Sequence, residues 1–227
     1  MTQPHYHGHR GRLRERFLRA GLSGLADYEI VELLLTLAIP RADVKIPAKQ
    51  LLDRFGTLRG ILDAPVAELR QVDGLGEVAP VALKLVREVA GLYVHQSAEE
   101  QPMFTDRRIL IDFWRLRIGA LDHEVFEVGY LDSGYRLLRD GVERLEEGTI
   151  NRAAVYPRTV ITAALRRNAA AIVLAHNHPN GRVQPSEQDK TLTRAIELAA
   201  TTVDIRVLDH LIISADASFS FRQEGLL

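Results

Sequence analysis

Hydrophobic and polar positions follow two different patterns along the chain, and the change falls near its middle. Over residues 10–94 the apolar positions recur at helical spacing between glycine and proline breaks, and nothing alternates like a strand. Residues 95–104 are acidic and polar and include Pro102, which is typical of a linker. We expect residues 1–9 to form a flexible tail. The pattern therefore predicts an all-helical module over residues 10–94 and a second domain over residues 105–227.

The second half of the chain combines strand and helix patterns. Alternation with period two over residues 124–131, followed by an Asp-Ser-Gly turn, predicts a hairpin, and the continuous apolar run 170–175 predicts a strand covered on both faces. The expected strands are 124–131, 135–138, 170–175 and 205–214. The expected helices are 105–117, 157–168 and 186–201. Strands and helices in alternation predict an α/β or α+β domain with a largely buried sheet.

Composition changes this picture in three ways. The chain has no cysteine, which excludes disulfide frameworks and thiolate metal sites, so any metal must be held by His, Asp or Glu. A formal net charge of -1 gives no hint of nucleic acid as a partner of the whole chain. No stretch reaches the ~18 apolar residues that cross a bilayer, and the N-terminus lacks an apolar signal core. We therefore expect a cytoplasmic location and no membrane partner.

Two histidines and an aspartate carry the strongest chemical signal. His176 and His178 stand two apart at the end of the 170–175 strand, so strand geometry points both imidazoles to the same side. A tight turn then leads into a helix whose first turn contains Asp189, which can return to the two imidazoles. Two imidazoles and one carboxylate leave a fourth position for water, as in catalytic zinc sites.

A zinc site that activates water also needs a base to take the proton. Glu124 is the leading candidate, because a carboxylate on the apolar face of a strand is costly unless it is used or paired. Glu127 and Glu143 are the alternatives.

The arrangement of these residues resembles the JAMM motif of MPN-type metalloproteases. His176-x-His178 is followed after ten residues by Asp189, Ser186 stands three before the aspartate, and Glu124 lies upstream in an apolar strand. The resemblance implies that the two histidines and Asp189 bind one Zn²⁺ per chain. It also implies that Glu124 acts as base through the bound water and that Ser186 helps to hold the oxyanion. The implied activity is cleavage of a peptide or isopeptide bond in an unknown peptide or protein substrate.

The flanking text is similar, more narrowly, to the bacterial RadC-type family. The segments that carry this likeness are HNHPNG at residues 176–181, PSEQD at 185–189 and VLDHLI at 207–212. The resemblance extends from about His9 to Leu227. It implies an N-terminal helical segment with a helix-hairpin-helix, then an MPN/JAB-like domain with a mixed sheet flanked by helices. Asn180 replaces the serine usual in the family, which affects expected substrate contacts more than metal binding.

Simpler interpretations exist for several of these residues. Ser186 and Asp189 match a helix capping box, which explains both without catalysis. Asp209 and His210 either orient a metal ligand or form a structural hydrogen bond within a strand. The contiguous His-Asn-His at 176–178 also suggests a metal-dependent nuclease. That hypothesis ranks lowest, because HNH nucleases place these residues apart on a ββα unit.

Two features of the helical module suggest contact with DNA. Gly74 and Gly76 lie in a turn of helix-hairpin-helix form, whose backbone N–H groups can face a phosphate. Arg12, Arg16 and Arg19 form a stripe on one helical face. A plain helix-turn-helix and a solvated amphipathic face explain both features without DNA. The second functional hypothesis is therefore a DNA-repair-associated accessory protein, whose MPN-like domain binds metal structurally or serves as an interaction surface.

Overall fold

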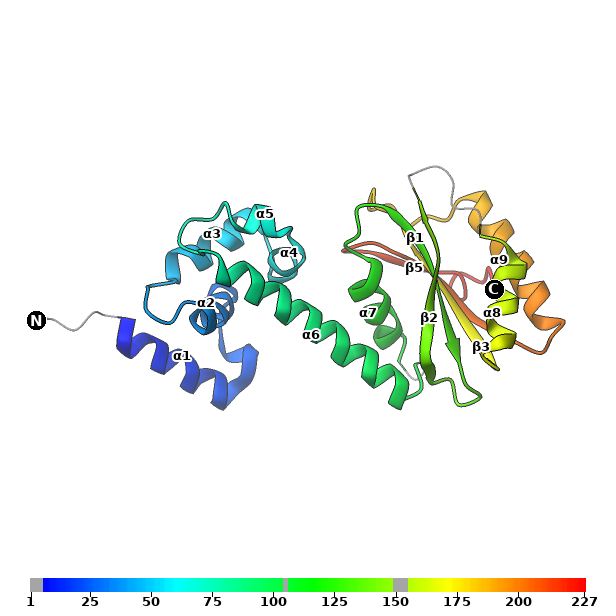
Figure 1. Cartoon of the computed structure of the whole chain (residues 1–227), viewed down its shortest axis with the longest axis horizontal. Coiled ribbons are helices and arrows are strands. Elements are labelled where there is room, and N and C mark those ends of the chain that lie inside the picture. The colour runs from blue at the N-terminus through cyan, green and yellow to red at the C-terminus, as the bar shows by residue number, and fades with distance from the viewer. Residues whose placement is uncertain (1–5, 104–105, 149–154) are drawn as a thin grey trace, which may run out of the picture. The chain divides into compact units, whose positions relative to one another are not determined.

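The computed structural model describes residues 6–103, 106–148 and 155–227, which form two compact units. The first unit ends at Ala90 and is helical; the second begins at Gly91 and contains a mixed sheet with helices on both faces (Figure 1). This confirms the predicted fold class. Among the residues that the structure describes, no helix combines the length and apolar content needed to cross a bilayer.

The N-terminal unit is built from short helices around one apolar core. Its elements are α1 (Tyr6–Ala20), η1 (Gly21–Gly24), α2 (Asp27–Ala38), α3 (Lys45–Phe55), α4 (Leu58–Asp63), α5 (Val66–Leu69) and the first part of α6 (Val78–Glu100). The buried core includes Val31, Leu35, Leu51, Ile61 and Leu83. Gly74 and Gly76 join α5 to α6 with φ of 83° and 59°, a left-handed conformation that side chains disfavour. Two consecutive helices can therefore turn within a few residues.

The C-terminal unit contains a five-stranded mixed sheet. Its elements are α7 (Arg107–Ile118), β1 (Glu124–Leu131), β2 (Leu137–Gly148), α8 (Pro157–Arg166), β3 (Ala171–Asn177), α9 (Glu187–Thr201), β4 (Arg206–Ile213) and β5 (Ser218–Ser220). The strand order is β2-β1-β3-β4-β5. Only β3 and β4 are parallel; the other neighbours are antiparallel. The crossover between the parallel pair is α9, which follows the candidate histidines directly.

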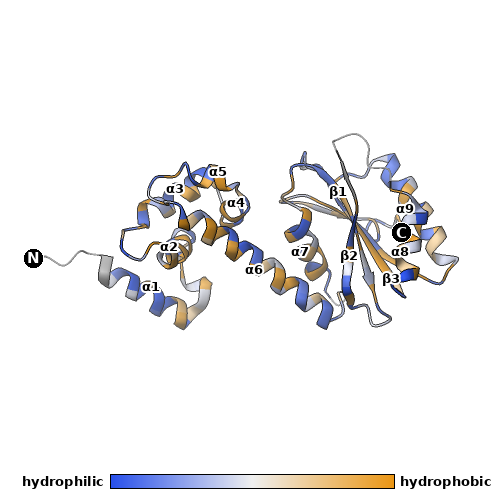
Figure 2. Ribbon diagram, viewed as in Figure 1, coloured by the Kyte–Doolittle hydropathy of each residue, from blue (hydrophilic) through white to orange (hydrophobic). Residues whose placement is uncertain are grey.

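Helices cover both faces of this sheet. Helix α7 packs on one face, where Trp114 contacts a core that includes Val125 and Val173. Helices α8 and α9 pack on the other face, where Ile196 meets Val128 and Leu174 (Figure 1). In Figure 2 the inner strand β3 carries mostly apolar colour, whereas β2 and the outer helices carry both colours, as expected for a sheet whose centre is buried between helices. The candidate site therefore has a rigid, buried strand as its base.

The structure corrects two predicted boundaries. The expected linker is wrong for residues 95–100, because α6 continues to Glu100 and ends just before Pro102. Alanine, glutamine and glutamate are good helix formers, and Ala98 is buried in the core of the second unit, so packing stabilises this last stretch. The expected tail is likewise helical from Tyr6 onward. Residues 1–5, 104 and 105 lie outside the described residues.

Candidate metal centre

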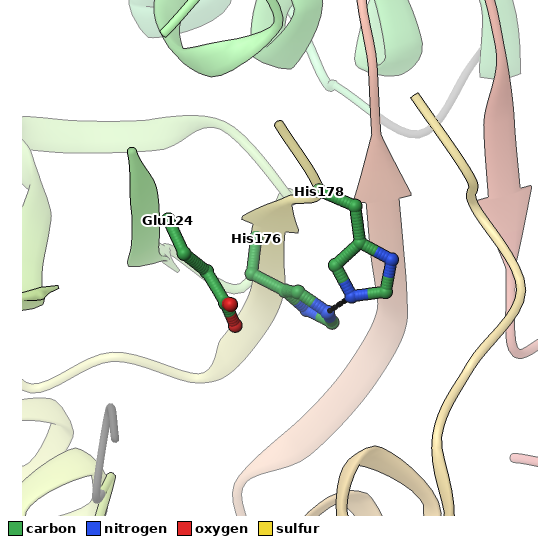
Figure 3. Close-up of side chains that lie close together, drawn as sticks. All are labelled: Glu124, His176 and His178. Atoms are coloured by element: carbon green, nitrogen blue, oxygen red, sulfur yellow. Dashed lines mark hydrogen bonds between the residues drawn. The ribbon is translucent and has the colours of Figure 1, made fainter. Parts of the chain in front are cut away.

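The candidate site lies where β3 ends beside the start of β1. Phe126 and His176 are register partners on these strands, and their rings stack with centroids 5.9 Å apart. Between the two histidines, Asn177 accepts a hydrogen bond from the main-chain N–H of Val125 at 2.8 Å and donates one to the carbonyl of His123 at 2.9 Å. The end of β3 is thereby fixed against the start of β1. Glu124, His176 and His178 consequently project toward one another (Figure 3).

The two imidazoles present their Nε2 atoms to the same point. The Nδ1 of His178 donates to the main-chain carbonyl of Arg182 at 2.6 Å, because a carbonyl can only accept, so Nε2 is the nitrogen left to bind a metal ion. The Nε2 atoms of His176 and His178 lie 3.1 Å apart (Figure 3). Ligands ~2.0–2.1 Å from one tetrahedral zinc are separated by roughly 3.3 Å. The two nitrogens therefore fit a single metal ion.

Asp189 approaches this pair from the first turn of α9. Its Oδ1 lies 3.4 Å from the Nε2 of His176, and its Oδ2 lies 4.0 Å from the Nε2 of His178. Oδ2 also accepts hydrogen bonds from the N–H and the hydroxyl of Ser186, each at 2.7 Å. The predicted capping box is thus confirmed. It does not compete with metal binding, because the cap uses Oδ2 while Oδ1 faces His176.

Glu124 is the one candidate base that the structure brings to the histidines. One of its carboxylate oxygens and one ring nitrogen of each histidine all lie within 4.8 Å of one another. Burial raises the pKa of Glu124, and nearby Asp189 raises it further, while His178 lowers it. Glu127 is instead buried, with Arg117 at 2.9 Å and Arg144 at 3.0 Å from its oxygens. The two arginines therefore neutralise the Glu127 carboxylate within the folded protein.

Glu143, the other alternative base, is also engaged elsewhere. It accepts a hydrogen bond from the hydroxyl of Tyr130 at 3.2 Å and pairs with Arg167 at 3.1 Å. The guanidinium of Arg167 in turn lies over the Tyr130 ring, 4.6 Å from its centroid. Among the described residues, the geometry favours Glu124 as the carboxylate that acts with the histidines.

The side chains of Asp209 and His210 point to opposite faces of the sheet, although the Asp209 carboxylate accepts a hydrogen bond from the main-chain N–H of His210 at 2.8 Å. Neighbouring residues of a strand point to opposite faces. His210 points toward the histidines, and its Nε2 lies 2.9 Å from the Nδ1 of His176. Asp209 lies on the face of α7, where its carboxylate accepts hydrogen bonds from the hydroxyl of Ser220 at 2.6 Å and the N–H of Arg222 at 3.1 Å. Asp209 therefore fits the structural interpretation, whereas His210 contacts a candidate ligand.

Thr193 is a site residue that sequence reasoning missed. Its hydroxyl donates to the main-chain carbonyl of Asp189 at 2.6 Å and lies 2.6 Å from the Nδ1 of His210. Burial lowers the pKa of His210 well below its ordinary value, as it also lowers the pKa of His176, so burial favours the neutral form of both rings. The available signal was the spacing, since a residue four after Asp189 shares its face of the helix.

Among the described residues of the helical unit, no cluster of possible metal ligands comparable to the candidate site occurs. Arg12, Arg16 and Arg19 line one groove together with His9 and two glutamates. Arg16 forms an ion pair with Glu29, which neutralises part of the stripe. Contact of this stripe, or of the Gly74 and Gly76 turn, with DNA stays a prediction.

Replacing Ser186 with alanine is expected to lower the free energy of unfolding by about 1 kcal/mol, because the N-cap acceptor of α9 is lost. Glycine at the same position is expected to lower it by only about a few tenths of a kcal/mol, since glycine is tolerated at N-caps. Urea denaturation of the three proteins measures this difference. Equal losses for Ser186→Ala and Ser186→Gly would show that the cap is not what stabilises the helix start.

A mixed sheet between helices, with two histidines and two carboxylates at the end of a central strand, defines a JAB-type domain with a candidate metal site. The family described as RadC-like JAB domain matches residues 104–226, and the family described as UPF0758 N-terminal matches residues 8–81. The chain therefore belongs to the RadC-like JAB domain family, which confirms the resemblance seen in its sequence.

Curated relatives resemble the chain over nearly its whole length. A UPF0758 protein of Methylibium petroleiphilum is 42% identical over 95% of this chain and 96% of its own length. UPF0758 proteins of Leptothrix cholodnii and Burkholderia cenocepacia are 41% and 40% identical, each over 95% of this chain and over 96% and 83% of their own lengths. These names specify no activity. Family membership supports a metal-dependent hydrolase or a DNA-repair role in general terms.

Proposed function

We propose that this protein is a zinc-dependent hydrolase of the JAMM type that cleaves a peptide or isopeptide bond. The observation that carries the proposal is the convergence of the His176 and His178 Nε2 atoms, 3.1 Å apart, with Oδ1 of Asp189 at 3.4 Å and the Glu124 carboxylate nearby. Three ligands of this kind leave a coordination position open, as catalytic zinc requires.

The proposed roles follow from the contacts of each side chain. When bound, zinc supplies Lewis acidity, which polarises a carbonyl and makes water more acidic. Glu124 accepts the proton from water on a carboxylate oxygen and returns it to the leaving amine. Burial raises its pKa, which brings the carboxyl closer to the pH at which it can both accept and donate. Ser186 orients Asp189 through the capping box, in which its hydroxyl donates its single proton to Oδ2. For its proposed role as oxyanion donor, the hydroxyl must rotate so that this proton leaves Asp189 and points to the substrate oxygen.

The surroundings of Glu124 favour a catalytic over a purely structural metal site. Within the described ranges no arginine, lysine or N–H donor contacts its half-buried carboxylate, whereas Glu127 on the same strand is neutralised by two arginines. A partly buried carboxylate without such a partner costs free energy. A carboxylate that is kept beside two imidazoles at this cost in free energy is typical of a functional site.

The test uses purified protein that is stripped with a chelator and reloaded with zinc. We expect about one zinc per chain, measured by elemental mass spectrometry, and cleavage within a peptide library or an ε-linked isopeptide library, measured by mass spectrometry of the products. Chelation is expected to stop the cleavage and zinc to restore it. Zinc-loaded protein that leaves both libraries intact would contradict the proposed activity. Magnesium-dependent DNA cleavage by the same protein would instead support the nuclease hypothesis.

A further inference from the structure

Three hydrogen bonds link the candidate metal centre to the main chain of α9. The hydroxyl of Thr193 lies 2.6 Å from the carbonyl oxygen of Asp189 and 2.6 Å from the Nδ1 of His210. The Nε2 of His210 lies 2.9 Å from the Nδ1 of His176. Thr193 and His210 are 0% exposed and His176 is 1% exposed. Solvent therefore does not compete for these hydrogen bonds.

The donor and acceptor of each hydrogen bond can be assigned in turn, starting from the bond between Thr193 and Asp189. A carbonyl can only accept, so the Thr193 hydroxyl donates its single proton to Asp189. Its oxygen then accepts from His210, which places the proton of that ring on Nδ1 and leaves Nε2 as an acceptor. That acceptor takes the Nδ1 proton of His176. The remaining nitrogen of His176, Nε2, carries a lone pair.

We propose that His210 is a positioning residue that holds His176 in the tautomer with its proton on Nδ1 and its Nε2 lone pair turned toward the candidate metal site. Thr193 sets the orientation of His210 in the same way. The proposal rests on the proposed function only in taking zinc as the ion that this lone pair binds. In the reversed arrangement the proton of His176 would lie on Nε2, 3.1 Å from His178, and would block metal binding.

The chain of bonds connects two of the three expected ligands. Asp189 offers its side chain to the site and its main-chain carbonyl to Thr193, so the residue that supplies the carboxylate also orients His176. His178 is oriented separately by the carbonyl of Arg182. The Nε2 lone pair of His176 is therefore turned toward the site before an ion arrives. Loss of a hydrogen bond that orients a metal ligand typically lowers metal affinity by about 10- to 100-fold.

The aromatic surroundings of His210 suit a substitution that removes its ring nitrogens and keeps an aromatic side chain. Its ring stacks on Phe221 with centroids 4.6 Å apart and meets the edge of Phe126 at 5.5 Å. Phenylalanine therefore keeps an aromatic ring of slightly larger size in this pocket and removes both nitrogens. Thr193→Val removes the hydroxyl at nearly constant shape, and Thr193→Ser is the matched control that keeps it. His210→Gln offers an amide oxygen as a replacement acceptor for His176.

The experiment measures zinc dissociation constants of the full chain by competition with a chromogenic chelator. We expect His210→Phe to bind zinc about 10- to 100-fold more weakly than the wild-type protein, and Thr193→Val to shift in the same direction by less. Thr193→Ser and His210→Gln are expected to bind more tightly than their partners Thr193→Val and His210→Phe. Folded His210→Phe with wild-type zinc affinity would overturn the proposal.

Nitrogen NMR of the metal-free protein tests the tautomers without zinc or substrate. Long-range proton–nitrogen correlations are expected to show the proton on Nδ1 in both His176 and His210. A proton on Nε2 of His210 would overturn the proposal even if zinc binds. Loss of peptide cleavage with intact zinc binding and these tautomers would instead contradict only the proposed function. Wild-type protein that binds no zinc would also contradict the proposed function. The tautomers measured by NMR would then test this inference on their own.

Discussion

Replacing Glu124 with glutamine is expected to lower peptide hydrolysis by about 10²- to 10⁴-fold while the protein keeps its zinc. Glutamine is nearly the same size and cannot accept a proton from water. The histidine ligands keep their anchors, because neither the Arg182 carbonyl nor His210 contacts position 124. Initial cleavage rates and zinc content of the same preparation measure both parts of this expectation.

Glu143→Gln is the control that separates the candidate bases. Its carboxylate is engaged by Tyr130 and Arg167, so its loss is expected to affect stability more than hydrolysis. Hydrolysis that survives Glu124→Gln but fails in Glu143→Gln would transfer the role of base to Glu143. Loss of zinc in Glu124→Gln would mean that Glu124 is a ligand, a role that its closeness to both imidazoles also permits.

The strands that build the site could be predicted from their local patterns, although the alternation of β1 indicates one buried face and the strand is buried on both. Residues 124–131 alternate with period two and form β1 with the predicted bounds. The apolar run 170–175 corresponds to β3, which is shifted by one residue at its start and continues to Asn177. Both strands lie inside the sheet, where helices cover both faces. Burial of this kind is what an apolar pattern reports.

The full extent of β2 and the existence of β5 could not be predicted, and the reason differs between the two strands. The hairpin partner of β1 was expected to end at Leu138, whereas β2 continues to Gly148 through a stretch rich in charged residues. An edge strand carries little apolar signal, and register shifts in its pairing with β1 interrupt the alternation further. β5 has three residues, too few for any periodicity to be recognised.

Some residues of the site could be placed from the nearby sequence alone, whereas His210 depends on how distant strands pair. His176, His178 and Asp189 lie within fourteen consecutive residues, so one strand end and one helix start were enough to bring them together. The orienting role of His210 depends on β4 lying beside β3 and on a register shift after Ile172. Sequence spacing does not contain that shift. It could therefore not decide which of Asp209 and His210 faces the histidines.

Removing two of the three expected ligands should release the metal. His178→Ala together with Asp189→Asn is expected to reduce zinc from about one per chain to near zero, because His176 alone cannot hold a divalent ion against a chelator. The pair is chosen so that the fold survives. His178 lies at the solvent edge of the site, and asparagine keeps an acceptor for the Ser186 cap. Elemental mass spectrometry after dialysis against a chelator gives the zinc content.

His123→Ala serves as the matched control for this loss. His123 precedes Glu124 and its ring contacts Asp122 at 2.8 Å, outside the group formed by Glu124, His176 and His178. We expect this variant to keep its zinc, because neither imidazole of the site depends on the His123 ring. If the double variant also kept about one zinc per chain, the ion would be bound elsewhere. The convergence of His176, His178 and Asp189 would then be a structural hydrogen-bond cluster, and the hydrolase proposal would lose its basis.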